Sequence, residues 1–322
     1  MTNPLVLFLL GFILGILTGF FGVGGGFLMT PALNIFGLDM VHAIGTGFFV
    51  IAGNALIGVL RHRRLGNVDL KLGTILGLCS VGGVEFGKRL VLHLEKLNLV
   101  GTYVRVAYII LLGLISMWML REYYYYWKTR QNGEARDDFG SVEGTHRMAH
   151  HINRIELPPK VSLPRSEVGA ISIWVIVISG LIIGFLSGFM GIGGGVVGLP
   201  LLIYVMGVPT IIAVGTSLVT VFLTSCYGTA VYALTGNVQW APGFIILAGS
   251  MIGVQCGVYA TEYVTGIKIK ILFALLLFVV AASVFLKQIG MVTISSYLVV
   301  CSAGALCLVI LLPLRKIIQG RH

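Results

Sequence analysis

The sequence predicts an all-α polytopic membrane protein of two homologous halves, each with about four transmembrane helices and a glycine-broken first helix. Three observations carry this prediction. Only 11% of the 322 residues are charged, against about a quarter in soluble proteins. Apolar runs of spanning length recur along the chain. A glycine-rich segment occurs twice, at Gly19–Gly26 and at Gly188–Gly195.

The apolar runs give the expected order of membrane segments. Seven of them are about as long as one bilayer crossing, at 40–60, 72–92, 99–120, 210–234, 240–262, 269–287 and 293–313. Two longer runs, 4–36 and 170–206, contain the glycine-rich segments. At about 1.5 Å per residue these two overshoot a hydrocarbon core of roughly 30 Å. The run at 170–206 is therefore our main candidate for a re-entrant segment.

Both longer runs are interrupted in the same way. Gly24–Gly26 is followed by Pro31, and Gly193–Gly195 is followed by Pro200. Consecutive glycines and a nearby proline break an α-helix. In lipid, a broken helix is tolerated only where it is buried in protein or lines a wet cavity. Breaks at matching positions of two halves point to a transporter binding site between them.

The repeat extends beyond the glycines. With one inserted residue, further blocks keep the same offset: Ala43–Gly47 with Ala213–Ser217, Gly66–Asp69 with Gly236–Gln239, and Gly83–Gly87 with Gly253–Gly257. We therefore expect a first transmembrane repeat at 1–121, a linker loop at 122–168, and a second repeat plus an additional C-terminal helix at 169–322. The halves are parallel or inverted according to whether each glycine segment returns to its starting side, and the sequence leaves both arrangements open.

The distribution of charge indicates the orientation in the membrane and argues against nucleic-acid binding. The net charge of +10 comes from basic residues in short loops between apolar runs, which is typical of a membrane protein facing an anionic cytoplasmic leaflet and not of a nucleic-acid binder. We expect the loop at 61–71, the linker at 122–168 and the C-terminal tail to be cytoplasmic, at the inner membrane. His146, His150 and His151 could ligate a metal, but histidines in a polar linker are usually solvated, so we predict no metal and no cofactor.

The glycine breaks supply chemistry suited to an anion. A helix that restarts after a break presents unpaired N–H groups and the positive end of its dipole. Two such ends facing each other bind an anion without any formal charge, and hydroxyl groups on the next span add donors. The predicted substrate-binding residues are Gly24, Gly25, Gly26, Gly193, Gly194, Gly195, Thr46, Thr216 and Ser217.

One acidic residue, Glu85, lies in the interior of a predicted span rather than at its end. Glu85 matches Gln255 in the repeat, beside Cys256, and an intramembrane ionisable group is a functional hypothesis by default. The alternative is an ion pair between Glu85 and Arg89, one helical turn apart. The residues assigned to proton coupling or gating are Glu85, Gln255, Cys256, Pro31 and Pro200.

The doubled motif resembles a known family. Gly19–Gly26, Pro31, Ala43–Thr46 and Gly66–Asp69, together with their copy in the second half, are similar to the TauE/SafE sulfite exporter family, also called the toluene sulfonate uptake permease family. The similarity covers both halves but not the linker. It implies an inner-membrane transporter of small sulfur oxyanions or organosulfonates, such as sulfite, thiosulfate, sulfoacetate or taurine-derived products.

The expected function is a secondary transporter, an exporter or a permease, of small sulfur-containing anions. An anion channel and a transporter of another small organic anion are the alternatives. An enzyme is not expected, because the spans contain no nucleophile–base pair and no metal set. The expected partners are the anion and the lipid bilayer, with protons as the candidate coupling ion; a homodimer stays open.

Overall fold

The structure is a computed structural model that describes residues 4–35, 37–131, 158–162, 170–261, 264 and 266–318. Its helices are α1 (Pro4–Phe21), α2 (Gly26–Ile35), α3 (Met40–Arg64), α4 (Leu70–Lys96), α5 (Val100–Gln131), α7 (Ile173–Met190), α8 (Gly195–Pro200), a π-helical turn (Leu201–Val205), α9 (Thr210–Leu234), α10 (Trp240–Thr261), α11 (Gly266–Gln288) and α12 (Val292–Ile318). Two short strands, β1 (Lys160–Ser162) and β2 (Ala170–Ser172), pair antiparallel.

The helical, polytopic architecture predicted from composition is confirmed. Eight helices are long and apolar enough to cross a membrane in the described part of the chain: α1, α3, α5, α7, α9, α10, α11 and α12. The run at 72–92, expected to be a span, forms most of α4, which carries Lys71, Glu85, Lys88 and Arg89 and is not one of these eight. Helix α5 continues to Gln131, so the first part of the expected linker loop is helical.

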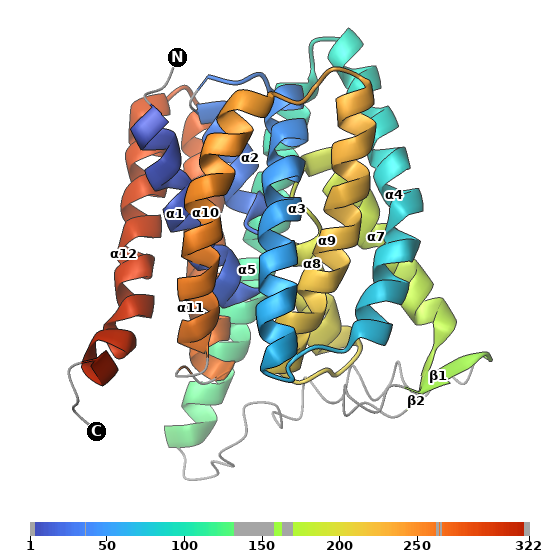
Figure 1. Ribbon diagram of the computed structural model, residues 1–322, viewed down its shortest axis with the longest axis vertical. Helices are drawn as coiled ribbons and strands as arrows, with labels where there is room; N and C mark the ends of the chain where they lie inside the picture. Colours follow the sequence, from blue (N-terminus) through green and yellow to red (C-terminus); the bar gives the residue numbers. More distant parts are fainter. Residues whose placement is uncertain are drawn as a thin grey trace.

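Each of the two longer apolar runs folds as a helical hairpin. The break after α1 places Gly22, Gly24 and Gly25 at φ of 69°, 74° and 77°, a region that residues with a Cβ rarely adopt. In Figure 1, α2 returns toward the end of the bundle where α1 began, and the chain after α7 likewise returns toward the end near β1 and β2. Both glycine segments are therefore re-entrant, although α1 and α7 are long enough to span.

The two hairpins enter the bundle from opposite ends (Figure 1). After the first hairpin, α3 runs away from the N-terminal end and α4 returns to it; after the second, α9 runs toward that end and α10 away from it. The arrangement of the second half is thus inverted relative to the first. The turn between α3 and α4, the end of α5 and the end of α12 lie at one end of the bundle.

The first helix of each hairpin packs on a helix of the other half through small residues. Gly11, Gly15 and Gly19 of α1 face α10, and a Cβ on Gly15 would lie 2.7 Å from the Cα of Ser250. Small residues at such spacing let helix backbones approach closely, which supplies the packing energy in lipid. The contact ties the first hairpin to the second half.

Helix α7 repeats this contact with α4. Gly180, Gly184 and Gly188 face α4, and a Cβ on Gly184 would lie 2.8 Å from the Cα of Ser80. The second hairpin is thus tied to the first half. Each half therefore holds the hairpin of the other.

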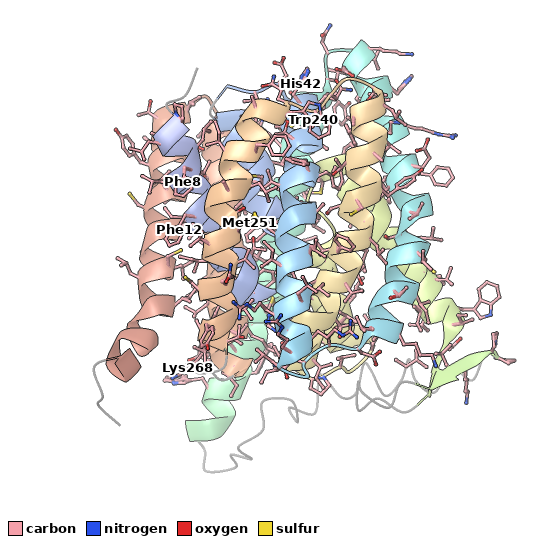
Figure 2. All side chains as sticks on the ribbon, viewed as in Figure 1. Phe8, Phe12, His42, Trp240, Met251 and Lys268 are labelled. Carbon is pink, nitrogen blue, oxygen red and sulfur yellow. The ribbon has the colours of Figure 1, made fainter. Side chains whose placement is uncertain are left out.

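Side chains at the two ends fit a membrane-embedded bundle. Figure 2 places His42 and Trp240 at one end and Lys268 at the other, with Phe8, Phe12 and Met251 between them. Trp240 is half exposed, and tryptophan is enriched where the bilayer meets water.

Candidate functional site

The two glycine breaks lie in contact inside the bundle, and we call this contact the glycine crossing (Gly22–Gly26 with Gly191–Gly195). A Cβ on Gly26 would lie 2.5 Å from the carbonyl carbon of Ile192, and one on Gly195 would lie 2.5 Å from the Cα of Val23. Every residue of both segments is buried. Only glycine allows the two turns to approach this closely.

Both helices that leave the crossing begin with free backbone donors. In α2, the N–H groups of Leu28 and Met29 donate to the carbonyl of Gly25; in α8, the N–H of Gly198 donates to Gly194. The N–H groups that precede these in each first turn have no partner within their own helix. The positive dipole ends of the two segments that restart after the breaks therefore meet at the crossing.

Two hydroxyl groups hold the carbonyls at the breaks. Ser217 Oγ donates to the carbonyl of Gly22 at 2.5 Å, and Thr30 Oγ1 donates to the carbonyl of Gly191 at 3.0 Å. Both hydroxyls come from an element of the opposite half or hairpin. The prediction places Ser217 at the break, whereas Thr30 was not singled out from the sequence.

A second pair of side chains holds the carbonyls one turn earlier. Tyr232 OH donates to the carbonyl of Gly188 at 2.9 Å, and His62 Nε2 lies 3.3 Å from the carbonyl of Gly19. His62 and Tyr232 occupy matching positions of α3 and α9, at the offset that aligns the rest of the repeat. Sequence analysis missed both, although that alignment was the signal that could have found them.

Thr46 and Thr216 contact the turns that precede α10 and α4, and their role as donors to the anion stays a prediction. Thr46 Oγ1 accepts a hydrogen bond from the N–H of Gln239 at 2.9 Å, and Thr216 Oγ1 accepts one from the N–H of Asp69 at 3.0 Å. These bonds fix the turns that precede α10 and α4. Both threonine oxygens are therefore engaged with those turns, and the pair positions helices.

Three buried hydroxyls without a hydrogen-bond partner among the described residues surround the crossing: Thr18, Ser187 and Ser225. A Cβ on Gly25 would meet Thr18 Oγ1, and one on Gly193 would lie 3.1 Å from Ser225 Oγ. A buried hydroxyl without a partner costs about 1–3 kcal/mol, so such groups call for an explanation. Here they are donors that a ligand at the crossing could use.

Two buried polar pairs join helices of different halves, one between α3 and α10 and one between α4 and α9. Ser250 Oγ donates to Asn54 Oδ1 at 2.5 Å, and Ser80 Oγ lies 2.7 Å from Thr224 Oγ1. All four residues are fully buried. The two pairs occupy matching positions of the repeat and lie beside the glycine contacts of α1 and α7.

Three residues assigned to proton coupling or gating lie on α4 and α10, Glu85 on the first and Gln255 and Cys256 next to each other on the second. Glu85 accepts hydrogen bonds from Arg89 Nε at 3.0 Å and from Tyr227 OH at 3.3 Å, so the ion pair considered as an alternative is formed. Gln255 Oε1 accepts from Arg61 at 2.7 Å on an exposed surface, and Cys256 is a free, half-buried thiol.

The two prolines follow the crossing directly. Pro31 lies inside α2, and Pro200 ends α8 where the π-helical turn begins. A proline cannot donate to the preceding turn of its helix, so both segments are weakened just past the crossing. His146, His150 and His151 of the linker lie outside the described residues.

Comparison with known proteins identifies relatives along most of the chain. The sequence model of the sulfite exporter TauE/SafE family matches residues 7–284. A probable membrane transporter protein of Methanocaldococcus jannaschii is 29% identical over 274 residues, covering 82% of this chain and 85% of the relative. The probable membrane transporter YdhB of Bacillus subtilis is 25% identical over 282 residues, covering 86% of this chain and 97% of the relative. No solved structure matches the chain.

Proposed function

The chain belongs to the sulfite exporter TauE/SafE family, and we propose that it is a secondary transporter of small sulfur-containing anions such as sulfite, thiosulfate or organosulfonates. Family membership makes the chain a membrane transporter and not an enzyme. The choice of anion rests on the family's description and on the chemistry of the glycine crossing.

The observation that carries the proposal is the contact between two broken segments, whose first-turn N–H groups have no partner within their own helix. The anion would be held by the N–H groups of Gly24–Gly26 and Gly193–Gly195, in the positive field of two helix starts. Ser217 would assist, and Thr18 and Ser225 would supply the hydroxyl donors that lack a partner. Thr46 and Thr216 would act through the turns that they fix.

The inverted hairpins support a mechanism of alternating access. Each hairpin enters from one end and is clamped to a helix of the other half, so moving one half against the other would open one end of the crossing and close the other. Pro31 and Pro200 weaken the segments just past the crossing and would serve as the bending points. Outward movement of one negative charge gains about 2.3 kcal/mol per 100 mV of inside-negative potential, so export would need no coupling ion.

Uptake against that potential would need a coupling ion, and protons are our candidate. Glu85, hydrogen-bonded to Tyr227, would be the proton carrier, with Gln255 and Cys256 at the matching place of the second half. This assignment is secondary to the anion site, because Arg89 already pairs with Glu85.

We also propose that 1–121 and 169–322 are homologous inverted halves joined by a cytoplasmic linker at 122–168. The duplication is supported by matching contacts in the two halves. Thr46 and Thr216 each accept from a backbone N–H before the next helix, and His62 and Tyr232 each contact a glycine carbonyl one turn before a break. The cytoplasmic side of the linker is supported by the segments that share its end of the bundle. The turn after α3, the end of α5 and the end of α12 lie together there. Those segments include basic residues, which favour the cytoplasmic side.

The test is transport by the purified protein in proteoliposomes. Saturable uptake and counterflow of labelled thiosulfate would support a carrier, whereas single-channel currents would favour the anion channel. Gly194→Val should abolish transport and any thermal stabilisation by the anion, since Gly194 has a φ of 87° and a Cβ there would lie 2.6 Å from Ile183. Gly304→Val is the matched control, because a Cβ on Gly304 meets nothing within 4 Å.

A further inference from the structure

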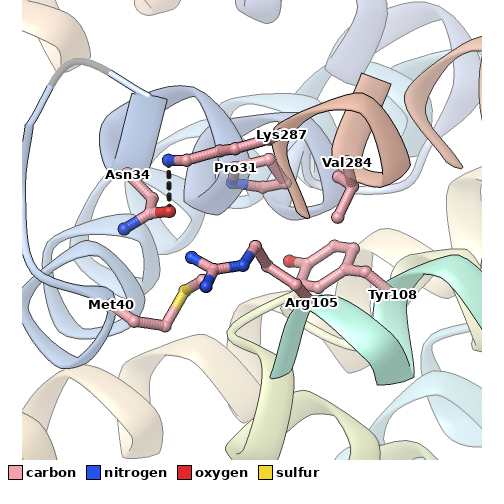
Figure 3. A pocket seen from close by; sticks show the side chains of 7 residues that line it. All are labelled: Pro31, Asn34, Met40, Arg105, Tyr108, Val284 and Lys287. Atoms are coloured by element: carbon pink, nitrogen blue, oxygen red, sulfur yellow. Dashed lines mark hydrogen bonds between the residues drawn. The ribbon is translucent and has the colours of Figure 1, made fainter. Parts of the chain in front are cut away.

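A pocket at one end of the bundle brings two positively charged side chains together. Arg105 lies near the start of α5 and Lys287 near the end of α11, and both line a small pocket beside the end of α2 (Figure 3). The other lining residues are Pro31, Asn34, Met40, Tyr108 and Val284. Two of these residues lie at the end of α2 and the start of α3, and in Figure 1 that end of the bundle is opposite the turn between α3 and α4.

Both cations have neutral partners. Lys287 Nζ donates to Asn34 Oδ1 at 2.5 Å, and Arg105 Nε donates to Gln288 Oε1 at 2.7 Å. In the part of the chain that the structure describes, neither side chain forms an ion pair with a carboxylate. The terminal guanidinium nitrogens of Arg105 and the remaining donors of Lys287 stay available.

This arrangement is incomplete without a negative charge. Two like charges in a partly buried pocket disfavour each other, and burial disfavours each one further. An anion beside them would remove both penalties. The planar fork of arginine suits two oxygens of an oxyanion, while lysine adds a compact point charge.

The pocket also opens outward. The pocket itself measures about 10 Å³, which is room for about one water molecule. An adjoining hollow of about 440 Å³ shares Asn34, Met40 and Arg105 with it but not Lys287, so a small oxyanion would occupy the hollow, against Arg105 and Asn34. Asp39 and Glu95 lie among the other residues that line this hollow. Their carboxylates would repel an anion held by Arg105 and so weaken its binding.

Hydrogen bonds connect the wall of the pocket to the second glycine segment. Tyr108 lines the pocket, and its OH donates to the carbonyl of Met190 at 3.0 Å, next to Gly191. Pro31 also lines the pocket and follows Thr30, whose hydroxyl donates to Gly191. The cationic pocket is therefore a neighbour of the crossing, separated from it by Tyr108 and α2.

We propose that Arg105, Lys287 and Asn34 form a second binding site, for one small oxyanion, next to the glycine crossing. The two cations neutralise the ion, and Asn34 orients Lys287. A transported sulfur oxyanion and the phosphate of a lipid headgroup share this chemistry. The identity of the ion as cargo rests on the proposed function, whereas the site itself does not.

Chemical footprinting of the unaltered protein tests the site without any risk of misfolding. Purified protein in detergent, freed of bound lipid, is treated with a dicarbonyl reagent, and modification of each arginine is followed by mass spectrometry with thiosulfate or with chloride at equal ionic strength. Thiosulfate should slow modification of Arg105 and leave exposed Arg63 and Arg64 unchanged. Equal modification rates for Arg105 in both salts would exclude thiosulfate as the ion. If lipid also fails to slow the modification of Arg105 in the nanodisc experiment below, the proposal is overturned.

Substitutions give the size of the effect. Arg105→Gln and Lys287→Gln should each weaken thiosulfate binding, measured by calorimetry, by about tenfold to a hundredfold, as expected for loss of a charged hydrogen-bond donor. Lys96→Gln is the matched control, because Lys96 is an exposed cation at the same end of the bundle. Unchanged affinity in folded Arg105→Gln and Lys287→Gln variants would contradict an ion held by these two residues.

Two further measurements separate the possible outcomes. Protection of Arg105 in nanodiscs of phosphatidylglycerol without added thiosulfate would assign the site to a lipid phosphate, and protection by thiosulfate alone would assign it to a free ion. Protection by neither overturns the proposal. In Gly194→Val, protection of Arg105 should persist even though transport is lost, so failure of the glycine crossing as a transport site leaves this site standing.

Discussion

The two hairpins reach the same geometry with different side chains. At the break of the first hairpin, the carbonyl of Gly22 is held by Ser217; at the break of the second, the carbonyl of Gly191 is held by Thr30. The matching positions are exchanged, because Gly47 corresponds to Ser217 and Leu199 corresponds to Thr30. Each site thus has one hydroxyl, supplied by a different helix.

The same exchange occurs one turn earlier, where His62 holds Gly19 and Tyr232 holds Gly188. What both halves retain is a donor for each carbonyl freed near the break, because a buried carbonyl without a partner is unfavourable. The identity of the donor is free to vary. The comparison teaches that the broken backbone is the common feature and that the side chains around it support it.

The contact between the two breaks should tolerate substitution less than any other feature of the two halves. Gly195→Val would force a side chain onto the backbone of Val23, and overpacking typically costs about 1–3 kcal/mol, more where the neighbour is backbone that cannot move aside. We expect a large drop in melting temperature in detergent and no transport. Gly113→Val, where a Cβ meets nothing within 4 Å, should melt like the unaltered protein; equal melting of both variants would show that the breaks do not depend on close contact.

The side chains that contact the glycine carbonyls one turn before the breaks, Tyr232 and His62, should contribute different amounts to stability. Tyr232→Phe leaves the carbonyl of Gly188 without its donor and should destabilise by about 1–3 kcal/mol. His62→Phe should destabilise less, because its contact is longer and because the change also removes a buried Nδ1 that has no partner in the described residues. Thermal unfolding of the two variants measures the difference, and the reverse order would contradict matched roles.

The exchanged hydroxyls allow a rescue experiment. Thr30→Val removes the donor to Gly191 and should cost about 1 kcal/mol. Adding Gly47→Ser places a serine at the position that matches Ser217. A Cβ on Gly47 would lie 3.1 Å from the present Thr30 Oγ1, so the new hydroxyl should reach the carbonyl that Thr30 held. The double variant should recover part of the lost melting temperature. A double variant less stable than Thr30→Val would show that the two positions are not equivalent.

The smallest effect is expected at the pair of Glu85 and Gln255. Glu85→Gln breaks a partly exposed ion pair with Arg89, which is worth about 0.2–1 kcal/mol at most, so melting should hardly change. If Glu85 carries protons, the variant should bind anion normally but lose the pH dependence of transport in proteoliposomes. Gln255→Glu is the control in the other half, and identical pH profiles for the unaltered protein and Glu85→Gln would reject the role.

The two glycine segments are the part of the candidate site that the sequence indicated most directly. The tri-glycine segments predicted where the helices break, and the structure brings the two breaks into contact. Ser217 was predicted to be a donor to the anion, and in the structure its hydroxyl donates to the carbonyl of Gly22 at the break. Thr18, Ser225 and Arg105 were missed, because nothing in a hydroxyl or a basic residue near a span end indicates which neighbour it faces.

The role of the threonines shows where sequence reasoning ended. Thr46 and Thr216 were predicted to be donors to the anion, and in the structure their oxygens accept from the backbone N–H groups of Gln239 and Asp69. A repeated hydroxyl predicts a repeated contact but not its partner. The partner lies 193 positions away from Thr46 in the chain, and only the folded arrangement selects it.

Composition and spacing by themselves determined that this chain is a helical membrane protein with two matching interruptions, because apolar length and glycine runs act locally on the backbone. Whether each interrupted segment turns back, from which end it enters, and which donors meet its carbonyls were decided by tertiary structure. The physical reason is that in lipid every freed backbone group must find a partner within the protein, and these partners come from helices of the opposite half.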